Sequence, residues 1–311
     1  MTTKHLNLYS LALASLLTVA FFTSYSSENQ ANSLTSNRSE DARLLPQMVK
    51  SPDLDRAFSF AGEALPMENF DVRERLDREL TSNSYFHSST LLNLKKAAKY
   101  FPVIEPILAE AGIPDDLKYI AVAESGLTNA TSPAGAKGFW QFMKGTGAEY
   151  GLEINSEVDE RYHLAKATRA ACKYLQKLKD RHGNWSLAAA AYNMGGGRLN
   201  SEMEKQRADN YYDLNLNQET MRYVFRIVAI KTILEDPSKF GFYLEEKDAW
   251  KPLPDAYEVE VTGAIENLGD FASKYGTTYR MLKIYNPWLK SSKLVNARRK
   301  TYLVKIPRQK F

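Results

Sequence analysis

Cysteine, histidine and phosphate-binding glycine motifs are scarce in this chain of 311 residues. The single cysteine, Cys172, has no partner for an internal disulfide and falls in a helical pattern, where a small apolar side chain packs well. The four histidines, His5, His87, His163 and His182, show neither metal-ligand spacing nor a nearby carboxylate pair. No glycine-rich loop stands between a strand pattern and a helix pattern. We therefore expect no metal ion and no cofactor.

A strong charge of either sign is also absent. The 41 basic and 37 acidic residues leave a formal net charge of +4. This charge is well short of a nucleic-acid-binding footprint, so we expect no nucleic-acid partner, although a mildly basic protein is not repelled by an anionic envelope polymer. With 44% hydrophobic residues, the chain is long enough to bury one sizeable core and a small second one.

One apolar run near the N-terminus indicates export. Residues 6–22 are apolar, follow a short segment with one lysine, and precede a small and polar stretch. The run is shorter than the ~20 residues that span a bilayer, so we interpret residues 1–26 as a secretory signal peptide, with an uncleaved membrane anchor as the alternative. No cysteine follows that would carry a lipid. We expect a protein of the periplasm or cell envelope, with a possible membrane tether through its N-terminus.

Helical patterns dominate the chain up to residue 245. Residues 27–84 read as a flexible tether and a helical lead-in, and residues 85–245 as one helical domain. Residues 218–234 are apolar on more than one face, which places that helix centrally. The expected helices span residues 72–80, 89–100, 103–111, 116–124, 136–150, 160–181, 186–194 and 218–234.

A second, smaller unit follows a proline-containing linker at residues 248–257. Strand patterns at residues 257–261 and 301–306 enclose helical stretches at residues 268–275 and 278–284. The expected fold is therefore mainly α, with a helical domain followed by a small β-α-α-β domain over residues 255–309.

Glu124 lies where carboxylates are rare. It stands at helical spacing after Leu117 and Ile120, on the apolar face of its segment, and Gly126 marks the end of that helix. Burial and the negative end of the helix dipole both disfavour the ionised form. We therefore expect this carboxyl to keep its proton towards neutral pH, as a general acid does. A surface glutamate near a helix end is the alternative interpretation.

Four motifs occur in a recognisable order. Residues 123–126 (AESG), 135–143 (GAKGFWQFM) and 191–195 (AYNMG) are followed by Tyr223-Val224. In order and spacing they resemble the lytic transglycosylase family related to goose-type lysozyme, and residues 94–120 look like the lead-in of its membrane-bound D type. The resemblance implies a lysozyme-like bundle of helices around a sugar-binding groove, with peptidoglycan glycan strands as substrate.

The resemblance also implies a reaction. The family cleaves the bond between N-acetylmuramic acid and N-acetylglucosamine and forms a 1,6-anhydro ring instead of adding water. Glu124 would first protonate the glycosidic oxygen and then, as a base, take the proton of the attacking C6 hydroxyl, while the substrate acetamide replaces a second carboxylate. Tyr223 is expected to face Glu124. The substrate-binding residues implied are Ser125, Gln141, Met143, Tyr192, Asn193 and Tyr223.

The C-terminal unit resembles a LysM domain. Residues 257–261, 268–272, 286–287 and 304–307 follow the order of that family. Residues 263–268 (GAIENL) depart from the usual Gly-Asp-Thr-Leu loop, so the resemblance supports the fold more firmly than glycan binding.

Two alternatives remain open. A hydrolase of lysozyme type would use the same acid with a second carboxylate and a water, whereas Asp159 and Glu160 are better read as helix caps. An inactive protein that binds the cell wall through its C-terminal unit is the other alternative. The sequence identifies no protein partner.

Overall fold

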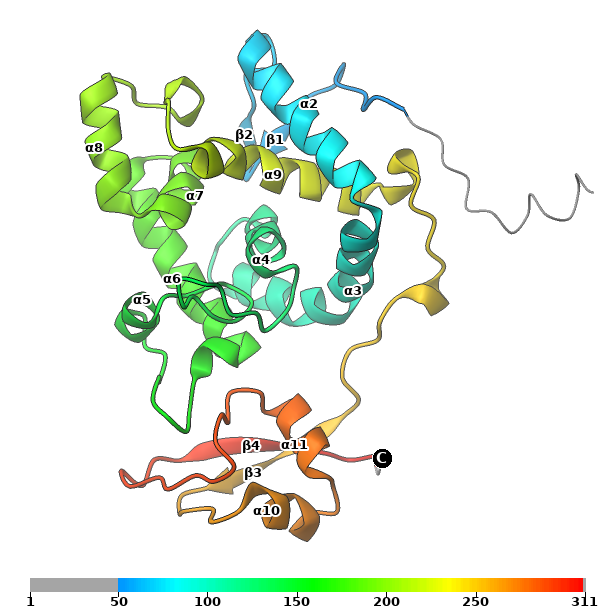
Figure 1. Ribbon diagram of the computed structural model, residues 1–311, viewed down its shortest axis with the longest axis vertical. Helices are drawn as coiled ribbons and strands as arrows, with labels where there is room; N and C mark the ends of the chain where they lie inside the picture. Colours follow the sequence, from blue (N-terminus) through cyan, green and yellow to red (C-terminus); the bar gives the residue numbers. More distant parts are fainter. Residues whose placement is uncertain (1–49, 310–311) are drawn as a thin grey trace, which may run out of the picture. The chain divides into compact units, whose positions relative to one another are not determined.

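The computed structural model describes residues 50–309 (Figure 1). The expected signal peptide and the first part of the expected tether lie outside the described residues. Within residues 50–309 there are ten α-helices and two short two-stranded sheets. The predicted fold class, mainly α with a small C-terminal β-α-α-β unit, is confirmed. In the same residues no helix combines the length and apolar character that a membrane span requires.

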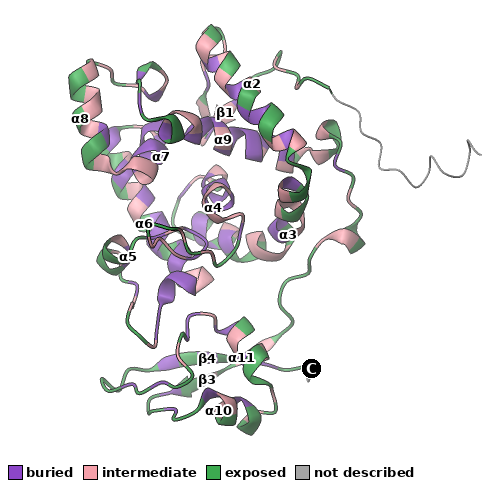
Figure 2. Cartoon of the chain, viewed as in Figure 1, coloured by how far each residue is buried: buried purple, intermediate pink, exposed green. Residues whose placement is uncertain are grey.

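Helix α9, Gln218–Glu235, is the centre of the helical domain. It packs against α2 (Phe70–Tyr85), α4 (Lys118–Ser125) and α7 (Trp185–Met194). Buried residues lie on several of its faces, and Figure 2 shows it buried along most of its length. The prediction that this segment is central is confirmed, because a helix that is apolar all round can be covered only by other helices. The other helices of the domain are α3 (His87–Glu110), α5 (Lys144–Glu149), α6 (Leu164–His182) and α8 (Gly196–Gln206).

Helix α3 is continuous, although its sequence contains two prolines. The sequence predicts separate helices over residues 89–100 and 103–111. The prediction of a break between them is wrong. Pro102 and Pro106 are four residues apart and both are exposed. Ala98, whose carbonyl lacks a donor from Pro102, is exposed too, so water can satisfy that group. Prolines on the solvent face therefore do not end this helix.

The helix expected over residues 136–150 begins only at Lys144. Residues 131–143 form a loop instead, which we call the groove loop. Gly138 (φ 80°) and Gln141 (φ 48°) both adopt the left-handed backbone region. Such residues cannot continue a right-handed helix, so the apolar pattern here was misread.

Helix α7 begins at Trp185, one residue before the predicted start. Its N-cap is Asn184, whose side chain accepts from the amide of Leu187. The carboxylate of Glu63 accepts from the amide and the hydroxyl of Ser186, at 3.0 and 2.8 Å. A carboxylate at a helix N-terminus is favoured by the helix dipole, so this bond fixes the helix that carries the AYNMG motif.

Glu63 belongs to a hairpin that we did not expect. Strands β1 (Ser59–Phe60) and β2 (Glu63–Ala64) pair antiparallel through Ala61 (φ 52°) and Gly62 (φ 82°). Positive φ at both central residues is the hallmark of a tight hairpin turn. Strands of two residues are too short to show alternation in a sequence.

The C-terminal module has the predicted β-α-α-β order. Strands β3 (Ala256–Val261) and β4 (Tyr302–Pro307) pair antiparallel, and α10 (Leu268–Lys274) and α11 (Tyr279–Tyr285) come between them in the chain. The module has a hydrophobic core of its own. Its buried members include Leu268, Leu282, Trp288, Leu289, Val304 and Ile306.

The close approach of Gly138 to a neighbouring backbone gives a first prediction. A Cβ at this position would lie 1.9 Å from the carbonyl oxygen of Arg161, at a φ that L-residues rarely adopt. We expect Gly138→Ala to lower the free energy of unfolding by roughly 2–5 kcal/mol, measured by urea denaturation. The matched control is Gly145→Ala, where an added Cβ meets nothing within 4 Å. Equal denaturation midpoints for the two variants would contradict the observed packing.

Candidate active site

Glu124 lies in the last turn of α4, which packs between α3 and α9. The helix ends at Gly126 in the left-handed conformation (φ 57°), as the sequence predicts. Burial among these helices raises the pKa of Glu124 to about 7, because the ionised carboxylate loses much of its hydration. The expectation of a carboxyl that keeps its proton towards neutral pH is confirmed.

Tyr223 is the direct partner of the acid. Its hydroxyl, on α9, donates to Oε1 of Glu124 at 2.5 Å, and the side chain is only 1% exposed. The prediction that Tyr223 faces Glu124 is confirmed. Because the bond stabilises the carboxylate, it lowers the pKa of Glu124 and opposes the effect of burial. Burial and the charge of Glu124 hold the pKa of the Tyr223 hydroxyl well above its usual value, so it stays a donor.

Two charges on α9 act on Glu124 with opposite sign. Glu219 raises the pKa of the acid and Arg226 lowers it. Glu219 lies one helical turn before Tyr223 and Arg226 lies about one turn after it. Sequence reasoning did not single out Glu219. The signal that would have found it is its spacing of four residues from Tyr223.

Lys96 supports the end of the helix that carries the acid. This buried side chain of α3 donates from Nζ to the carbonyl oxygen of Gly126. Burial lowers the pKa of Lys96. An ammonium group at a helix C-terminus satisfies a free carbonyl and complements the helix dipole. Lys96 therefore fixes the position of the last turn, a contact that no local sequence pattern predicts.

Two predicted substrate-binding hydroxyls bind the groove loop. The hydroxyl of Ser125 lies 2.9 Å from the carbonyl oxygen of Phe139. The hydroxyl of Tyr192 donates to the carbonyl oxygen of Trp140 at 2.6 Å. The Tyr192 hydroxyl uses its proton on the loop backbone, whereas the Ser125 hydroxyl shares its proton between the carbonyls of Phe139 and Ala121. Each oxygen retains a lone pair that can accept from a sugar.

Gln141 turns its amide nitrogen towards its own loop. Nε2 donates to the carbonyl oxygens of Ala130 (3.2 Å) and Gly138 (2.7 Å). Both amide protons are thereby used, which leaves Oε1 as an acceptor for a sugar hydroxyl or an acetamide N–H. Met143 precedes α5, is 47% exposed and makes none of these contacts.

Asn193 joins the end of α7 to the first turn of α9. Its Oδ1 accepts from the hydroxyl of Thr220 at 2.7 Å, and its Nδ2 donates to Glu219 at 3.3 Å. Asn193 and Glu219 therefore form a polar pair near Tyr223. The charge of Glu124 raises the pKa values of both Tyr192 and Tyr223 in addition to burial, which places both rings within electrostatic range of the acid.

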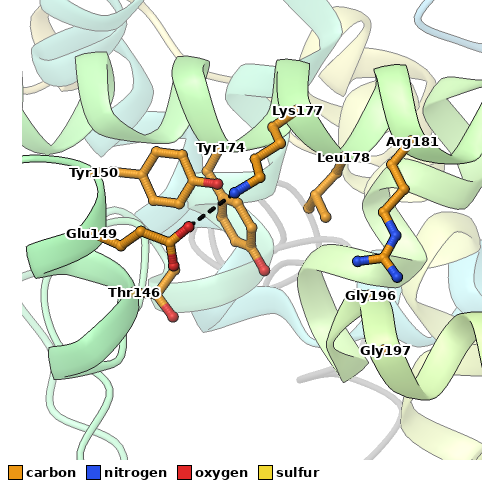
Figure 3. A pocket seen from close by; sticks show the side chains of 9 residues that line it. All are labelled: Thr146, Glu149, Tyr150, Tyr174, Lys177, Leu178, Arg181, Gly196 and Gly197. Carbon is orange, nitrogen blue, oxygen red and sulfur yellow. Dashed lines mark hydrogen bonds and ion pairs between the residues drawn. The ribbon is translucent and has the colours of Figure 1, made fainter.

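A cavity of about 150 Å³ is lined by residues of α5, α6 and the start of α8 (Figure 3). The ring of Tyr174, which lines it, is 5.2 Å from the ring of Tyr192. Lys177 and Arg181 reach it from α6, and the ammonium of Lys177 binds the carboxylate of Glu149 at 2.9 Å. Glu124 does not line this cavity, so it is separate from the acid.

Two separate stretches of the chain match two known domain families. Residues 102–215 match the transglycosylase SLT domain, and residues 257–310 match the soluble lytic transglycosylase C-terminal LysM-like domain. The chain therefore contains an SLT transglycosylase domain followed by a LysM-like domain. The first match includes Glu124, Gln141 and Asn193. Tyr223 lies beyond it and is tied to the acid by geometry.

The chain is also a distant homologue of transglycosylases of the D type. Membrane-bound lytic murein transglycosylase D of Escherichia coli strain K12, and that of E. coli O6:H1, are each 30% identical over 302 residues. The match covers 92% of this chain and spans 65% of the length of these relatives.

Two solved structures are also similar. An inactive mutant of lytic transglycosylase Slt from Pseudomonas aeruginosa is 21% identical, with a TM-score of 0.38, over 49% of this chain and 26% of that one. The 70 kDa soluble lytic transglycosylase of E. coli is 20% identical, with a TM-score of 0.39, over 51% of this chain and 28% of its own.

The raised pKa of Glu124 predicts a pH-dependent effect of Glu124→Gln on stability. Below about pH 4 the carboxyl is protonated in both folded and unfolded states, so the two proteins have nearly equal free energies of unfolding. Above pH 7 the wild type carries a buried carboxylate, so the variant becomes more stable. The difference between about 7 and the ordinary 4.5 corresponds to at most about 3 kcal/mol.

Urea denaturation at about pH 4 and about pH 8 measures this difference. The control is Glu149→Gln, which removes an exposed ion pair and changes stability by less than about 1 kcal/mol. A Glu124→Gln variant with the same stability relative to wild type at both pH values would contradict a raised pKa.

Proposed function

We propose that this protein is a peptidoglycan lytic transglycosylase that cleaves between N-acetylmuramic acid and N-acetylglucosamine and leaves 1,6-anhydro ends. The observation that carries the proposal is the hydrogen bond from Tyr223 to a half-buried Glu124 whose pKa is about 7. At neutral pH both protonation states of this group are populated. One residue can therefore serve first as acid and then as base.

The first step is protonation of the leaving group. Glu124 donates its proton to the glycosidic oxygen, the bond to the anomeric carbon breaks, and positive charge develops on the sugar. The carboxylate that results keeps the hydrogen bond from Tyr223, which stabilises it in a site that is otherwise poorly hydrated. The same contact therefore stabilises the product of proton transfer.

The second step closes the anhydro ring. The acetamide oxygen of the substrate bonds to the anomeric carbon, and Oε1 of Gln141 is free to accept from the acetamide N–H and orient it. The C6 hydroxyl then displaces the acetamide while the carboxylate of Glu124 takes its proton. No water is consumed, and Glu124 returns to its starting state.

Hydrolysis of lysozyme type is the second candidate, and Glu219 is the observation that favours it. This exposed carboxylate acts electrostatically on Glu124 and is held by Asn193. A hydrolase would use it to activate a water. We prefer the first candidate because the matched SLT domain and the curated relatives are both those of lytic transglycosylases.

The proposed substrate places the protein in the cell envelope. The apolar run at residues 6–22 supports export to the periplasm, and the similarity to transglycosylases named as membrane-bound supports a tether at the N-terminus. The LysM-like module supports an affinity for glycan strands.

Mass spectrometry of the products tests the reaction. Purified peptidoglycan incubated with the protein should release muropeptides that are one water lighter than hydrolysis products and carry 1,6-anhydro ends. Glu124→Gln should lower the rate by more than about a thousandfold, because it removes the proposed proton donor to the leaving oxygen. Reducing-end products would mean a hydrolase. Binding to peptidoglycan without release of any product would favour the inactive wall-binding protein.

The pH profile of activity tests the environment of the acid. We expect kcat/KM to fall as the pH rises through about 7, because the acid form is lost. Tyr223→Phe removes a bond that stabilises the carboxylate and should move this fall to higher pH. Glu219→Gln removes a neighbouring negative charge and should move it to lower pH while anhydro products persist. Loss of all product release in Glu219→Gln would instead support hydrolysis.

A further inference from the structure

The groove loop holds Gln141 in a conformation that its own sequence does not favour. Gln141 has a φ of 48°, a region that residues other than glycine adopt only where their surroundings impose it. The expected role of Gln141 requires its Oε1 to stay in one place. The contacts that impose this geometry therefore bear on the proposed reaction.

Arg161 holds the groove loop at two points. It lies in η2 (Glu160–Tyr162), and its Nη1 donates to the carbonyl oxygens of Gly135 (3.2 Å) and Phe142 (3.1 Å), on either side of Gln141 in the chain. The side chain is only 4% exposed. Its backbone carbonyl also lies against Gly138, where no Cβ fits. Arg161 thus clamps both ends of the turn that presents Gln141.

Asp159 fixes the orientation of this arginine. Nε of Arg161 donates to Oδ1 of Asp159 at 2.9 Å, and Nη2 donates to Oδ2 at 2.8 Å. Both side chains are 4% exposed, and two parallel bonds to a carboxylate set the plane of the guanidinium group. Asp159 also caps η2, since its Oδ1 accepts from the amide of Arg161. Its ion pair with Arg161 is an additional role. The helix predicted from residue 160 is wrong at its start, because α6 begins at Leu164 with His163 as its N-cap.

The segment that carries Asp159 also binds the C-terminal module. The amide of Asp159 donates to the carbonyl oxygen of Trp288 at 2.9 Å, and the amide of Lys290 donates to the carbonyl oxygen of Glu157 at 2.7 Å. Val158, between them, is fully buried in the hydrophobic core of the module. Through these contacts, residues 157–159 of the SLT domain pack against the C-terminal module.

Polar contacts reinforce this docking. The hydroxyl of Tyr302 donates to the carboxylate of Glu153 at 3.1 Å, and Nζ of Lys300 lies 3.0 Å from the same carboxylate. The ammonium of Lys290 lies 4.1 Å from the ring centre of Tyr162, next to Arg161. Residues 153–162 therefore contact both the C-terminal module and the groove loop.

We infer that Arg161 is a positioning residue for the reaction proposed above, and that docking of the C-terminal module sets the geometry of the groove through residues 153–162. The module fixes Asp159, Asp159 orients Arg161, and Arg161 holds the loop that presents Gln141. The module thus acts on the active site itself, in addition to any affinity for the cell wall. This inference rests on the proposed function only for its catalytic consequence.

A double-mutant cycle tests the catalytic consequence. The substrate is a short, soluble, peptide-free glycan of alternating N-acetylglucosamine and N-acetylmuramic acid, for which attachment to the wall is irrelevant. We expect Arg161→Met to lower kcat by about ten- to a hundredfold, since a misplaced groove loop is costly. Gln141→Ala should then cost much less in that background than in the wild type. Additive effects would overturn the role of Arg161.

The same cycle with Val158→Asp in place of Arg161→Met tests the module. Non-additivity with Gln141→Ala is the expected result, whereas unchanged kinetics on this substrate would overturn the role of the module. The matched control is Lys247→Met, an exposed residue of an ion pair with Glu245, whose effect should add to that of Gln141→Ala.

Hydrogen exchange tests the coupling without reference to activity, so that its failure is distinguishable from failure of the proposed function. In the wild type, the amide of Lys137 donates to the carbonyl oxygen of Phe142, and the amide of Gly138 donates to that of Ala130, just before the groove loop. We expect Arg161→Met and Val158→Asp to raise exchange there by at least about tenfold, with α9 unchanged. An increase confined to residues 288–302 would overturn the coupling. If Val158→Asp does not fold, Glu153→Gln weakens the same docking more gently.

Discussion

The hydrogen bond between Tyr223 and Glu124 is the constraint on which the site depends. It joins the central helix α9 to the last turn of α4, two elements about a hundred residues apart in the chain. Burial raises the pKa of the acid, and the hydrogen bond from Tyr223 lowers it. The phenol donor moderates the effect of burial, and the pKa of the acid settles near neutral pH. A single carboxyl in that range can give and take a proton within one turnover.

The polar groups around this pair bind one another before any sugar is present. The hydroxyls of Ser125 and Tyr192 hold carbonyl groups of the groove loop, and Asn193 is held by Thr220 and Glu219. A site whose donors and acceptors are already oriented loses little entropy when substrate arrives. The family motifs therefore encode a framework of side-chain to backbone bonds as much as a set of sugar contacts.

The sequence predicts those parts of the molecule whose pattern is local. The central helix, expected at residues 218–234, is found at Gln218–Glu235, and the four elements of the module are each found within about two residues of their expected bounds. The first part of the helix expected at residues 136–150 is a loop instead. Arg161, which holds this loop through two hydrogen bonds, lies outside the segment and so leaves no mark on its local pattern. Likewise, Lys96 on α3 and Glu219 on α9 act on the end of α4 and on Glu124. Contacts between helices leave no mark on the pattern of either segment. The family resemblance predicted that Tyr223 faces the acid, whereas periodicity alone did not predict this contact.

The most direct test of this account is the ionisation of Glu124 itself. Difference infrared spectroscopy of the wild type against Glu124→Gln isolates the carbonyl band of the protonated carboxyl. The account predicts that this band disappears with a midpoint near pH 7 and that the midpoint rises in Tyr223→Phe. A midpoint near the ordinary value for glutamate, about 4.5, would contradict it, because the carboxyl would then already be ionised at neutral pH and could not protonate the leaving oxygen.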